Sequence, residues 1–298
     1  MKNKNKKKFV NYDKNIITAN IGDACTGYMR IFGANNNLMR HLPSLVDGLK
    51  PGERRILYNI YEMGIMHNSR YKKVETLVGN TLKYHPHGST PVYETLVKLA
   101  QPWNNIQCLV DGFGNFGSAM GDSAAAGRYI EARMSFYSYK CFFEEFSPEI
   151  VDMKPNYDES EMEPEYLPAR YPNALINNTF GIGYGISTGI PTYNFKEVVE
   201  LTIKLLEDPD YPDITLIPDS PSCAYIIDEG QFTEISETGK GKFKMRGVID
   251  IDEVNNSLII KSAPLQVSVN DMKETIIDSI PGIKEIRDNT DNLAYEKN

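Results

Sequence analysis

Apolar positions recur at helical spacing in a stretch near the start of the chain. Residues 52–64 place four apolar side chains on one face, with Arg54 and Arg55 opposite or beside that face. The spacing predicts an amphipathic helix that turns one side to a core and carries two positive charges on the other.

A second helix is predicted to begin at Ser89 or Thr90. Thr90 is expected to cap its free amides, and Pro91 suits the first helical position, where its missing N–H costs nothing. Val92, Leu96 and Leu99 then form the apolar stripe. Two helices joined by a polar segment, the second opening on a basic face, indicate a helix-turn-helix.

The pattern changes further along the chain. Residues 106–112 indicate a short strand, and the Pro-rich, acidic stretch 148–172 is the expected domain boundary. Beyond it we expect a helix over 195–206 capped by Asn194, strands within 241–252 and 257–267, and a helix over 268–280 stopped by Pro281. Helices and strands do not alternate regularly, so the predicted fold class is α+β.

Charge is distributed unevenly. The 298 residues carry a net charge of −8, but residues 50–98 hold eight Lys or Arg and four Glu, a local +4. Residues 144–170 hold nine acids and two bases, a local −7. These blocks indicate either a localised anion-binding face or two solvated surfaces, and charge alone does not choose between them.

The ends and the cysteines exclude some classes of protein. No apolar run reaches the roughly 18 residues that a membrane span needs. The basic start, MKNKNKKK, lacks the apolar stretch of a secretory signal; it is either a flexible tail or a segment that touches nucleic acid or a partner. Four scattered cysteines form no CxxC pair, which favours reduced thiols in the cytoplasm.

A glycine-rich segment offers one competing interpretation. Gly112, Gly114 and Gly117 match G-x-G-x-x-G after a predicted strand, which is the phosphate-binding pattern of dinucleotide folds. No good helix and no βαβ unit follow. A turn that lets backbones approach closely therefore explains these glycines better than a nicotinamide or flavin site.

Five stretches, taken in order, resemble the A subunit of bacterial type IIA topoisomerases, the gyrase A and topoisomerase IV A family. They are LPSLVDGLKPGERRILYNIYEMG, YKKVETLVGNTLKYHPHGSTPVYETLVKLAQ, LVDGFGNFGSAMGDSAAAGRYIEARMS, the run from PNYDESEMEP to GISTGIPTYN, and ETGKGKFKMRG with GIKEIRDNTDN. The resemblance covers roughly residues 35–298. It implies a basic tail and arm over 1–34, a winged-helix breakage-reunion domain over 35–150 and an incomplete tower domain over 151–298.

The resemblance places a nucleophile at Tyr129, in AAAGRYIEAR. A tyrosine that replaces a DNA hydroxyl at phosphorus conserves the bond energy for resealing. A free phenol has a pKa of about 10 and needs help at neutral pH. Arg128 is the adjacent cation that can stabilise the phenolate and the phosphorane oxygens.

The resemblance also implies further DNA contacts in the first domain. His85 and His87 are expected at the scissile phosphate, with Arg40 nearest to the bond; a metal pair and a structural turn are the alternatives for the histidines. Lys50, Arg54, Arg55 and Lys83 are expected to hold phosphates. This chain has Glu53 where the family carries histidine, in KPGERR instead of KPVHRR, which puts the contact at that position in doubt unless the acid points away or pairs with a base.

In the tower, Ile182 of FGIGYG is expected to wedge between base pairs, with a core isoleucine as the alternative. Lys240 and Lys242 are expected to contact phosphates. Thr90 and Glu94, four residues apart at the start of a helix, match the two positions that hold quinolone drugs through a magnesium ion and water.

The implied activity is ATP-dependent passage of one DNA duplex through another, performed as an A2B2 assembly with a homodimer of this chain. No P-loop or metal-domain acid cluster is found, and Asp250 and Asp252 lack that cluster's context, so the B subunit is expected to hold Mg²⁺ and ATP. A non-catalytic winged-helix paralogue is the alternative. The sequence stops inside an expected tower strand, which suggests a fragment or a short phage-encoded form without the coiled coil and exit-gate interface, in the cytoplasm of a bacterial or phage-infected cell.

Overall fold

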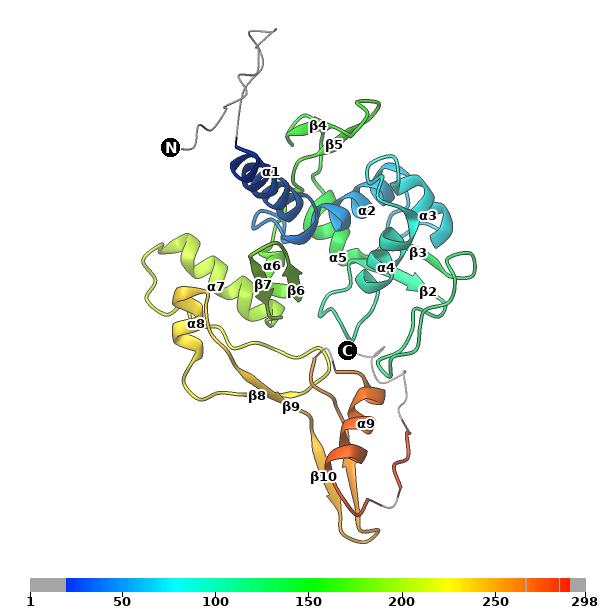
Figure 1. Cartoon of the computed structure of the whole chain (residues 1–298), viewed down its shortest axis with the longest axis vertical. Helices are drawn as coiled ribbons and strands as arrows, with labels where there is room; N and C mark the ends of the chain where they lie inside the picture. The colour runs from blue at the N-terminus through cyan, green and yellow to red at the C-terminus, as the bar shows by residue number, and fades with distance from the viewer. Residues whose placement is uncertain (1–19, 266, 284, 290–298) are drawn as a thin grey trace, which may run out of the picture.

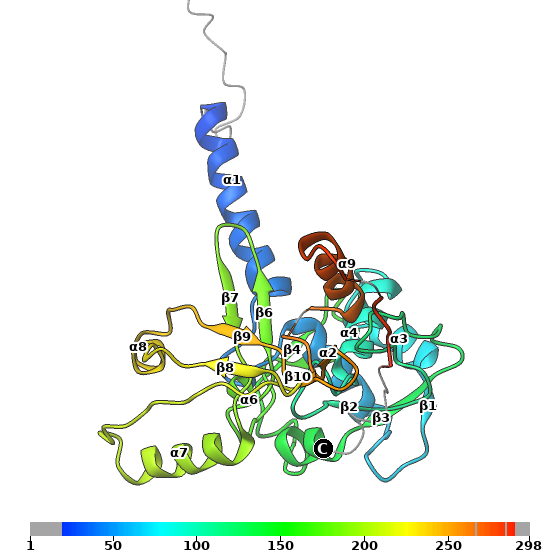
Figure 2. The same ribbon diagram turned by 90° about the horizontal axis from the view of Figure 1, so that it is seen from below.

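The computed structural model describes residues 20–265, 267–283 and 285–289, so the basic tail lies outside the described residues. Helix α1 (Ile21–Asn36) comes first, and the Asn20 side chain caps it by accepting from the Gly22 amide at 2.8 Å. It continues into a five-residue π turn, η1 (Asn37–His41). Figures 1 and 2 show α1 projecting from the rest of the molecule.

Three helices and a small sheet form the main body. The helices are α2 (Pro51–Glu62), α3 (Val74–Thr81) and α4 (Ser89–Leu99). Strands β1 (Lys72–Lys73), β2 (Val110–Phe113) and β3 (Glu131–Met134) pair antiparallel in the order β1-β3-β2. Their apolar faces meet in one core that includes Ile56, Ile60, Leu77, Leu96 and Met134.

The helices predicted near 52–64 and from residue 89 are confirmed, but the expected cap of the second is wrong. Gly88 is the N-cap residue of α4 at φ 98°, and Thr90 lies inside the helix without a capping hydrogen bond. Glycine tolerates this backbone where other residues are strained. Helix α3 was not predicted from the apolar pattern, and the strand expected over 106–112 begins only at Val110.

The main core extends beyond the first 150 residues. Helix α5 (Phe136–Ser138) and turn η2 (Tyr139–Phe143) lead to a hairpin of β4 (Met153–Pro155) and β5 (Met162–Pro164). Leu167 is fully buried in the same core as α2 and α4. Part of the acidic stretch 148–172 therefore packs against the first body, through Leu167 in the core and Val151, Met153, Ala169 and Tyr171 against it.

The second half consists of small antiparallel units. Helix α6 (Asn173–Ile176) precedes a hairpin of β6 (Thr179–Ile182) and β7 (Ser187–Ile190). Helix α7 (Phe195–Glu207) is capped by Asn194 as predicted. Strand β8 (Tyr225–Ile227) pairs with β9 (Lys244–Arg246), and helix α8 (Phe232–Thr238) lies between them in sequence.

The last described elements match their predictions in type. Strands β10 (Ile249–Asp252) and β11 (Ser257–Ile260) form a hairpin, and α9 (Val269–Ser279) is capped by Ser268 and ends before Pro281. The strand expected over 241–252 is interrupted at Gly247 and becomes two strands, β9 and β10. The described chain is thus a mixed α/β fold with small antiparallel sheets. Among the described helices, none is long and apolar enough to cross a membrane.

Candidate active site

The glycine-rich segment after β2 is a loop that returns to β3, not a dinucleotide site. Gly114 and Gly117 adopt φ values of 110° and 93°, which side chains disfavour. Gly112 packs so closely on the Phe116 ring that a Cβ would lie 2.6 Å from it. All named strands of the described chain pair antiparallel, so the βαβ unit that a dinucleotide site needs is not formed by them.

The end of this loop is fixed on the first turn of α3. The Glu75 amide donates to the Gly127 carbonyl and the Val74 amide to the Ile130 carbonyl, both at 3.1 Å. A Cβ on Gly127 would lie 3.0 Å from the Glu75 carboxylate and 3.2 Å from the Glu75 amide nitrogen, so a larger residue would fit only if Glu75 shifted by a few tenths of an ångström. Between these anchors, Tyr129 stands out with 65% of its side chain exposed.

A cation lies beside this tyrosine. The Arg128 guanidinium carbon is 4.6 Å from the centre of the Tyr129 ring. Lys73 of β1 donates to the Tyr129 carbonyl at 3.3 Å and pairs with Glu131 at 2.8 Å, which ties the end of the loop and the start of β3 to β1. The arrangement presents an accessible phenol with positive charge next to it, suited to meeting an anion.

A basic pocket of about 300 Å³ lies between η1, α2 and α4. One acid, Glu53, lies among its lining side chains. The cationic and imidazole groups are Arg40, His41, Lys50, His85, His87 and Lys98. The structure thus brings together four predicted site residues, Arg40, Lys50, His85 and His87, while Lys98 and His41 were not predicted.

The hydrogen bonds define which nitrogen of each histidine is protonated. Arg40 donates to Nδ1 of His87 at 2.8 Å, and Arg55 donates to Nδ1 of His85 at 3.1 Å. A guanidinium can only donate, so both Nδ1 atoms accept and a neutral ring carries its proton on Nε2. Burial and the charges of Arg55, His87 and Arg40 lower the pKa of His85 to about 4. Burial and Arg40 also lower the pKa of His87.

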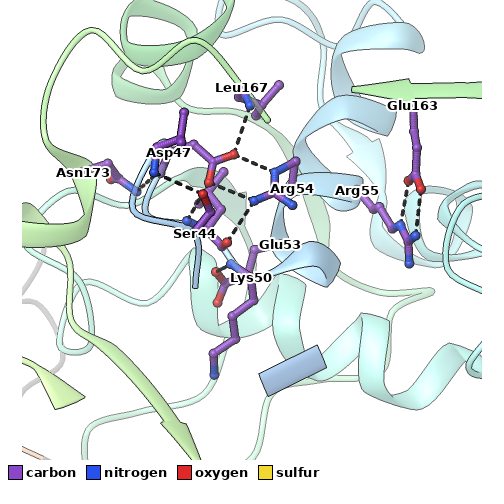
Figure 3. A network of polar contacts seen from close by, with 11 residues as sticks. Ser44, Asp47, Lys50, Glu53, Arg54, Arg55, Glu163, Leu167 and Asn173 are labelled. Carbon is purple, nitrogen blue, oxygen red and sulfur yellow. Dashed lines mark hydrogen bonds and ion pairs between the residues drawn. The ribbon is translucent and has the colours of Figure 1, made fainter. Parts of the chain in front are cut away.

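Arg54 does not reach the surface, contrary to its expected role at a phosphate. Its guanidinium donates to both carboxylate oxygens of Asp47, at 2.6 and 2.9 Å, and both side chains are buried. Asp47 also accepts from the amides of Leu49 and Leu167 at 3.0 Å (Figure 3). Arg54 therefore fixes the turn before α2 through Asp47, and Asp47 in turn links that turn to the Leu167 amide.

Arg55 is likewise engaged within the protein. It forms a two-point ion pair with Glu163 of β5, at 2.6 and 2.7 Å, besides its bond to His85. Only 11% of the side chain is exposed. The geometry therefore gives Arg55 a positioning role toward His85 and does not fit the expected direct phosphate contact.

Glu53 lies in the wall of the basic pocket, half-buried, with its carboxylate turned back onto the backbone at the start of α2. Its carboxylate accepts from the Lys50 amide at 2.8 Å, which satisfies a free N–H at the start of α2. Burial raises the pKa of Glu53 above its ordinary value, and the Lys50 amide opposes that shift. The Lys50 ammonium meanwhile donates to the Phe180 carbonyl of β6 at 2.5 Å.

Tyr129 and the basic pocket lie at opposite ends of α3. The Val74 amide at its start bonds the residue after Tyr129, and the Thr81 carbonyl at its end accepts from the His85 amide at 3.0 Å. An eight-residue helix is about 12 Å long. One chain therefore does not place its own phenol in its own pocket.

The other predicted contact residues are spread over the surface. Ile182 is 65% exposed at the end of β6, which does not fit a core isoleucine. Lys83 pairs with Glu62 and lies 3.9 Å from Glu161, so acids share its charge. Lys240 and Lys242 are exposed in the segment before β9. Thr90 and Glu94 are exposed and lie one turn apart on α4.

Among the described residues, no group of three or more His, Cys, Asp or Glu side chains is placed to hold a metal ion. Asp250 pairs with Lys261, and Asp252 accepts from the side chain and amide of Asn255 at the β10–β11 turn. These contacts account for both aspartates as parts of the hairpin.

Comparison with known proteins identifies relatives of this chain. The family model for the A subunit of DNA gyrase/topoisomerase IV matches residues 40–296. A DNA gyrase A subunit of Granulibacter bethesdensis is 41% identical over 266 residues, covering 85% of this chain and 28% of that protein. One from Helicobacter pylori is 36% identical over 295 residues, covering 95% of this chain and 36% of that protein.

The chain spans about a third of the length of the curated relatives it matches, including the gyrase A subunit of Aminobacterium colombiense, which is 41% identical over 268 residues with 33% of its length covered. The match of the family model includes Arg40, the pocket histidines and Tyr129. This chain therefore belongs to the family formed by the A subunits of DNA gyrase and topoisomerase IV.

Proposed function

We propose that this chain is the DNA breakage-reunion subunit of a type IIA topoisomerase, with Tyr129 as the nucleophile. The observation that carries the proposal is the exposed phenol at the end of an anchored loop, with the Arg128 guanidinium beside its ring. A binding protein has no need to hold a tyrosine in this way, and the gyrase relatives disfavour the non-catalytic alternative.

The reaction is a transesterification at phosphorus. The Tyr129 oxygen forms a bond to the phosphorus while one bond from phosphorus to a deoxyribose oxygen breaks. The phenolic proton leaves, and the departing DNA oxygen takes up a proton to become a hydroxyl. Resealing reverses each step, so no external energy enters the cleavage itself. Arg128 stabilises the negative charge that grows on the phenol and phosphate oxygens.

The basic pocket holds the scissile phosphate in this proposal. Arg40 supplies charge, and the neutral histidines supply N–H donors from Nε2, because their Nδ1 atoms already accept from arginines. His85 and His87 therefore act as donors to phosphate oxygens rather than as proton acceptors. Lys50 and Lys98 add positive potential at the pocket wall.

The distance along α3 favours a homodimer that shares its sites. Since the phenol and the pocket of one chain lie at opposite ends of that helix, the tyrosine of one protomer would complete the pocket of the other. The B subunit would hold Mg²⁺, which neutralises charge on the phosphate oxygens when bound, and would hydrolyse ATP. Two copies of each subunit, in the bacterial cytoplasm, make the proposed assembly.

The proposed domains divide the chain near residue 150. Helices α2–α4 with the sheet β1-β3-β2 belong to the proposed winged-helix domain over 35–150. The proposed tower domain covers 151–298, and Leu167 of its first segment packs into the core of the winged-helix domain. Ile182 is the proposed DNA wedge, with Lys240, Lys242 and Lys83 as outer phosphate contacts. Thr90 and Glu94 remain predicted quinolone contacts. Drug-stabilised cleavage by the Thr90→Val and Glu94→Ala variants tests this prediction, and wild-type drug sensitivity in both variants would show that these two residues do not hold the drug.

The substitution Tyr129→Phe tests the nucleophile. It keeps the ring and removes the attacking oxygen, so we expect normal DNA binding and loss of covalent protein–DNA adduct in the presence of Mg²⁺ and the B subunit. Adducts are measured after denaturation on a labelled duplex. Tyr157→Phe, which changes an exposed tyrosine elsewhere, is the matched control and should form adduct as wild type does.

An adduct that persists in Tyr129→Phe, or one mapped by mass spectrometry to another tyrosine, would overturn the assignment. The chain without the B subunit should not relax supercoiled plasmid at any Mg²⁺ concentration. Relaxation by the isolated chain would instead place the metal site within this polypeptide.

A further inference from the structure

The β6–β7 hairpin lies unusually close to the π turn η1. A Cβ on Gly181 would lie 2.1 Å from the His41 carbonyl oxygen, and one on Gly183 would lie 2.3 Å from Oδ1 of Asn37. Both glycines therefore face η1 at distances that no larger residue permits. Side chains alternate along a strand, so Ile182 between them faces the other way, where 65% of it is exposed.

Asn37 binds the tip of this hairpin at two points. Its Nδ2 donates to the Tyr184 carbonyl at 3.1 Å, and its Oδ1 accepts from the Tyr184 amide at 2.7 Å. The side chain thus pairs with one residue as a neighbouring strand would. Asn37 is only 9% exposed, so both bonds are largely shielded from water.

Contacts around this pair hold the hairpin from both sides. The Tyr184 ring lies edge-on to Phe32 at 5.8 Å and to His41 at 6.3 Å between ring centres. At the base of the hairpin, Lys50 donates to the Phe180 carbonyl. Figure 2 shows β6 and β7 running beside the lower part of α1.

The same five-residue turn also carries Arg40. Three residues after Asn37, Arg40 donates to His87 across the basic pocket at 2.8 Å. The exposed Ile182 and the pocket are therefore both attached to η1, one through Asn37 and the other through Arg40. A displacement of the hairpin relative to η1 would change the distance between the two.

We propose that Asn37 is a positioning residue that fixes the Ile182 wedge at a set distance from the phosphate pocket. The inference rests on the proposed function, since it assumes that Ile182 enters DNA. Its consequence is that the bend and the cut fall at a fixed spacing along the duplex. Without the two bonds to Tyr184, the hairpin tip would move and DNA would bind without being bent correctly.

The test is Asn37→Leu, which keeps the side-chain size and removes both hydrogen-bonding groups. Bending is measured by energy transfer between dyes at the two ends of a duplex, with Mg²⁺ and the B subunit present; affinity is measured by fluorescence anisotropy. We expect the ratio of bent to unbent complex to fall about tenfold, in line with a lost buried hydrogen bond, and affinity to change little. Asn35→Leu, at an exposed position of α1, is the matched control and should bend DNA normally.

Gly183→Ala provides a second route to the same displacement, because the added Cβ meets Oδ1 of Asn37. It should reproduce the bending loss even if Asn37→Leu lowers the melting temperature. Combining Asn37→Leu with Ile182→Ala should reduce bending no further than Ile182→Ala alone.

The outcomes separate the two proposals. Normal bending by Ile182→Ala would overturn the wedge and leave Tyr129 untouched. Bending lost in Ile182→Ala but normal in Asn37→Leu and Gly183→Ala would overturn the role of Asn37 alone. Equal loss of bending in Asn35→Leu would also overturn it, because the effect would then belong to α1 in general.

Discussion

The exposure of charged side chains differs between the surroundings of the basic pocket and the β9–β11 strands. At the pocket, Arg54 and Arg55 are 7% and 11% exposed and each forms a two-point pair with a carboxylate. In the strands, Lys261 pairs with Asp250 while both side chains are about half exposed. Lys240 and Lys242 are exposed as well.

This difference separates two uses of positive charge that look alike in sequence. Buried, paired arginines fix the backbone and orient His85, so they act on DNA only through other groups. Exposed lysines contribute positive potential at long range. Their ion pairs with nearby acids add little to the stability of the fold, because water and salt screen them. Substitutions in the first region should therefore change folding, and those in the second should change only binding.

Asp47→Asn should have the largest effect. It leaves the buried Arg54 guanidinium without its counter-charge, and breaking a buried pair in this way costs about 3–5 kcal/mol. Urea unfolding followed by circular dichroism measures the change. Asp250→Asn, which breaks the exposed pair with Lys261, is the control and should leave the midpoint unchanged. Equal shifts in the two variants would remove the proposed distinction.

Because of His85, the free energy of unfolding should depend on pH in the acidic range. Its folded pKa of about 4 lies below the ordinary value of 6.5, so the unfolded chain gains a proton first as pH falls. No stability is lost above pH 6.5; the loss grows between 6.5 and 4 and approaches about 3 kcal/mol. His85→Asn keeps an acceptor for Arg55 without a titrating ring. The pH-dependent difference between the two proteins isolates this contribution, and parallel curves would contradict it.

Lys240→Gln with Lys242→Gln should have the smallest effect. Removing two exposed charges should weaken DNA binding several-fold at low salt and reduce the slope of log affinity against log salt by about one unit per lysine. The unfolding midpoint should not move. A salt slope equal to that of wild type would show that neither lysine faces a phosphate.

Local pattern was sufficient to predict much of the fold. Apolar stripes at helical spacing mark α2, α4, α7 and α9. Capping residues also mark two of these helices, because a cap such as Asn194 or Ser268 bonds to backbone amides only a few residues away. Helix α3 was missed because eight residues give barely two turns of pattern and no side chain caps it. Gly88 was not predicted as the cap of α4, because the sequence does not reveal its φ of 98° and the neighbouring Ser and Thr are the more usual capping residues.

The candidate site was predicted by residue type but not by geometry. Motif resemblance identified Tyr129 and the pocket histidines, yet it could not tell that Arg54 and Arg55 are buried. That depends on Leu167 and Glu163, which lie more than 100 positions further along the chain. Asn37 was missed for the same reason, since Tyr184 is 147 positions away. Spatial partners at such separations leave no periodic signal in one sequence.

The bond from the Leu167 amide to Asp47 also constrains when the site can form during synthesis. The two residues are 120 positions apart. At a translation rate of roughly 5–20 residues per second, the turn before α2 waits at least several seconds for its last partner. Contacts at such separation form slowly because the loop between them must first be closed. The pocket is therefore a late product of folding, completed only after the segment around residue 167 has left the ribosome.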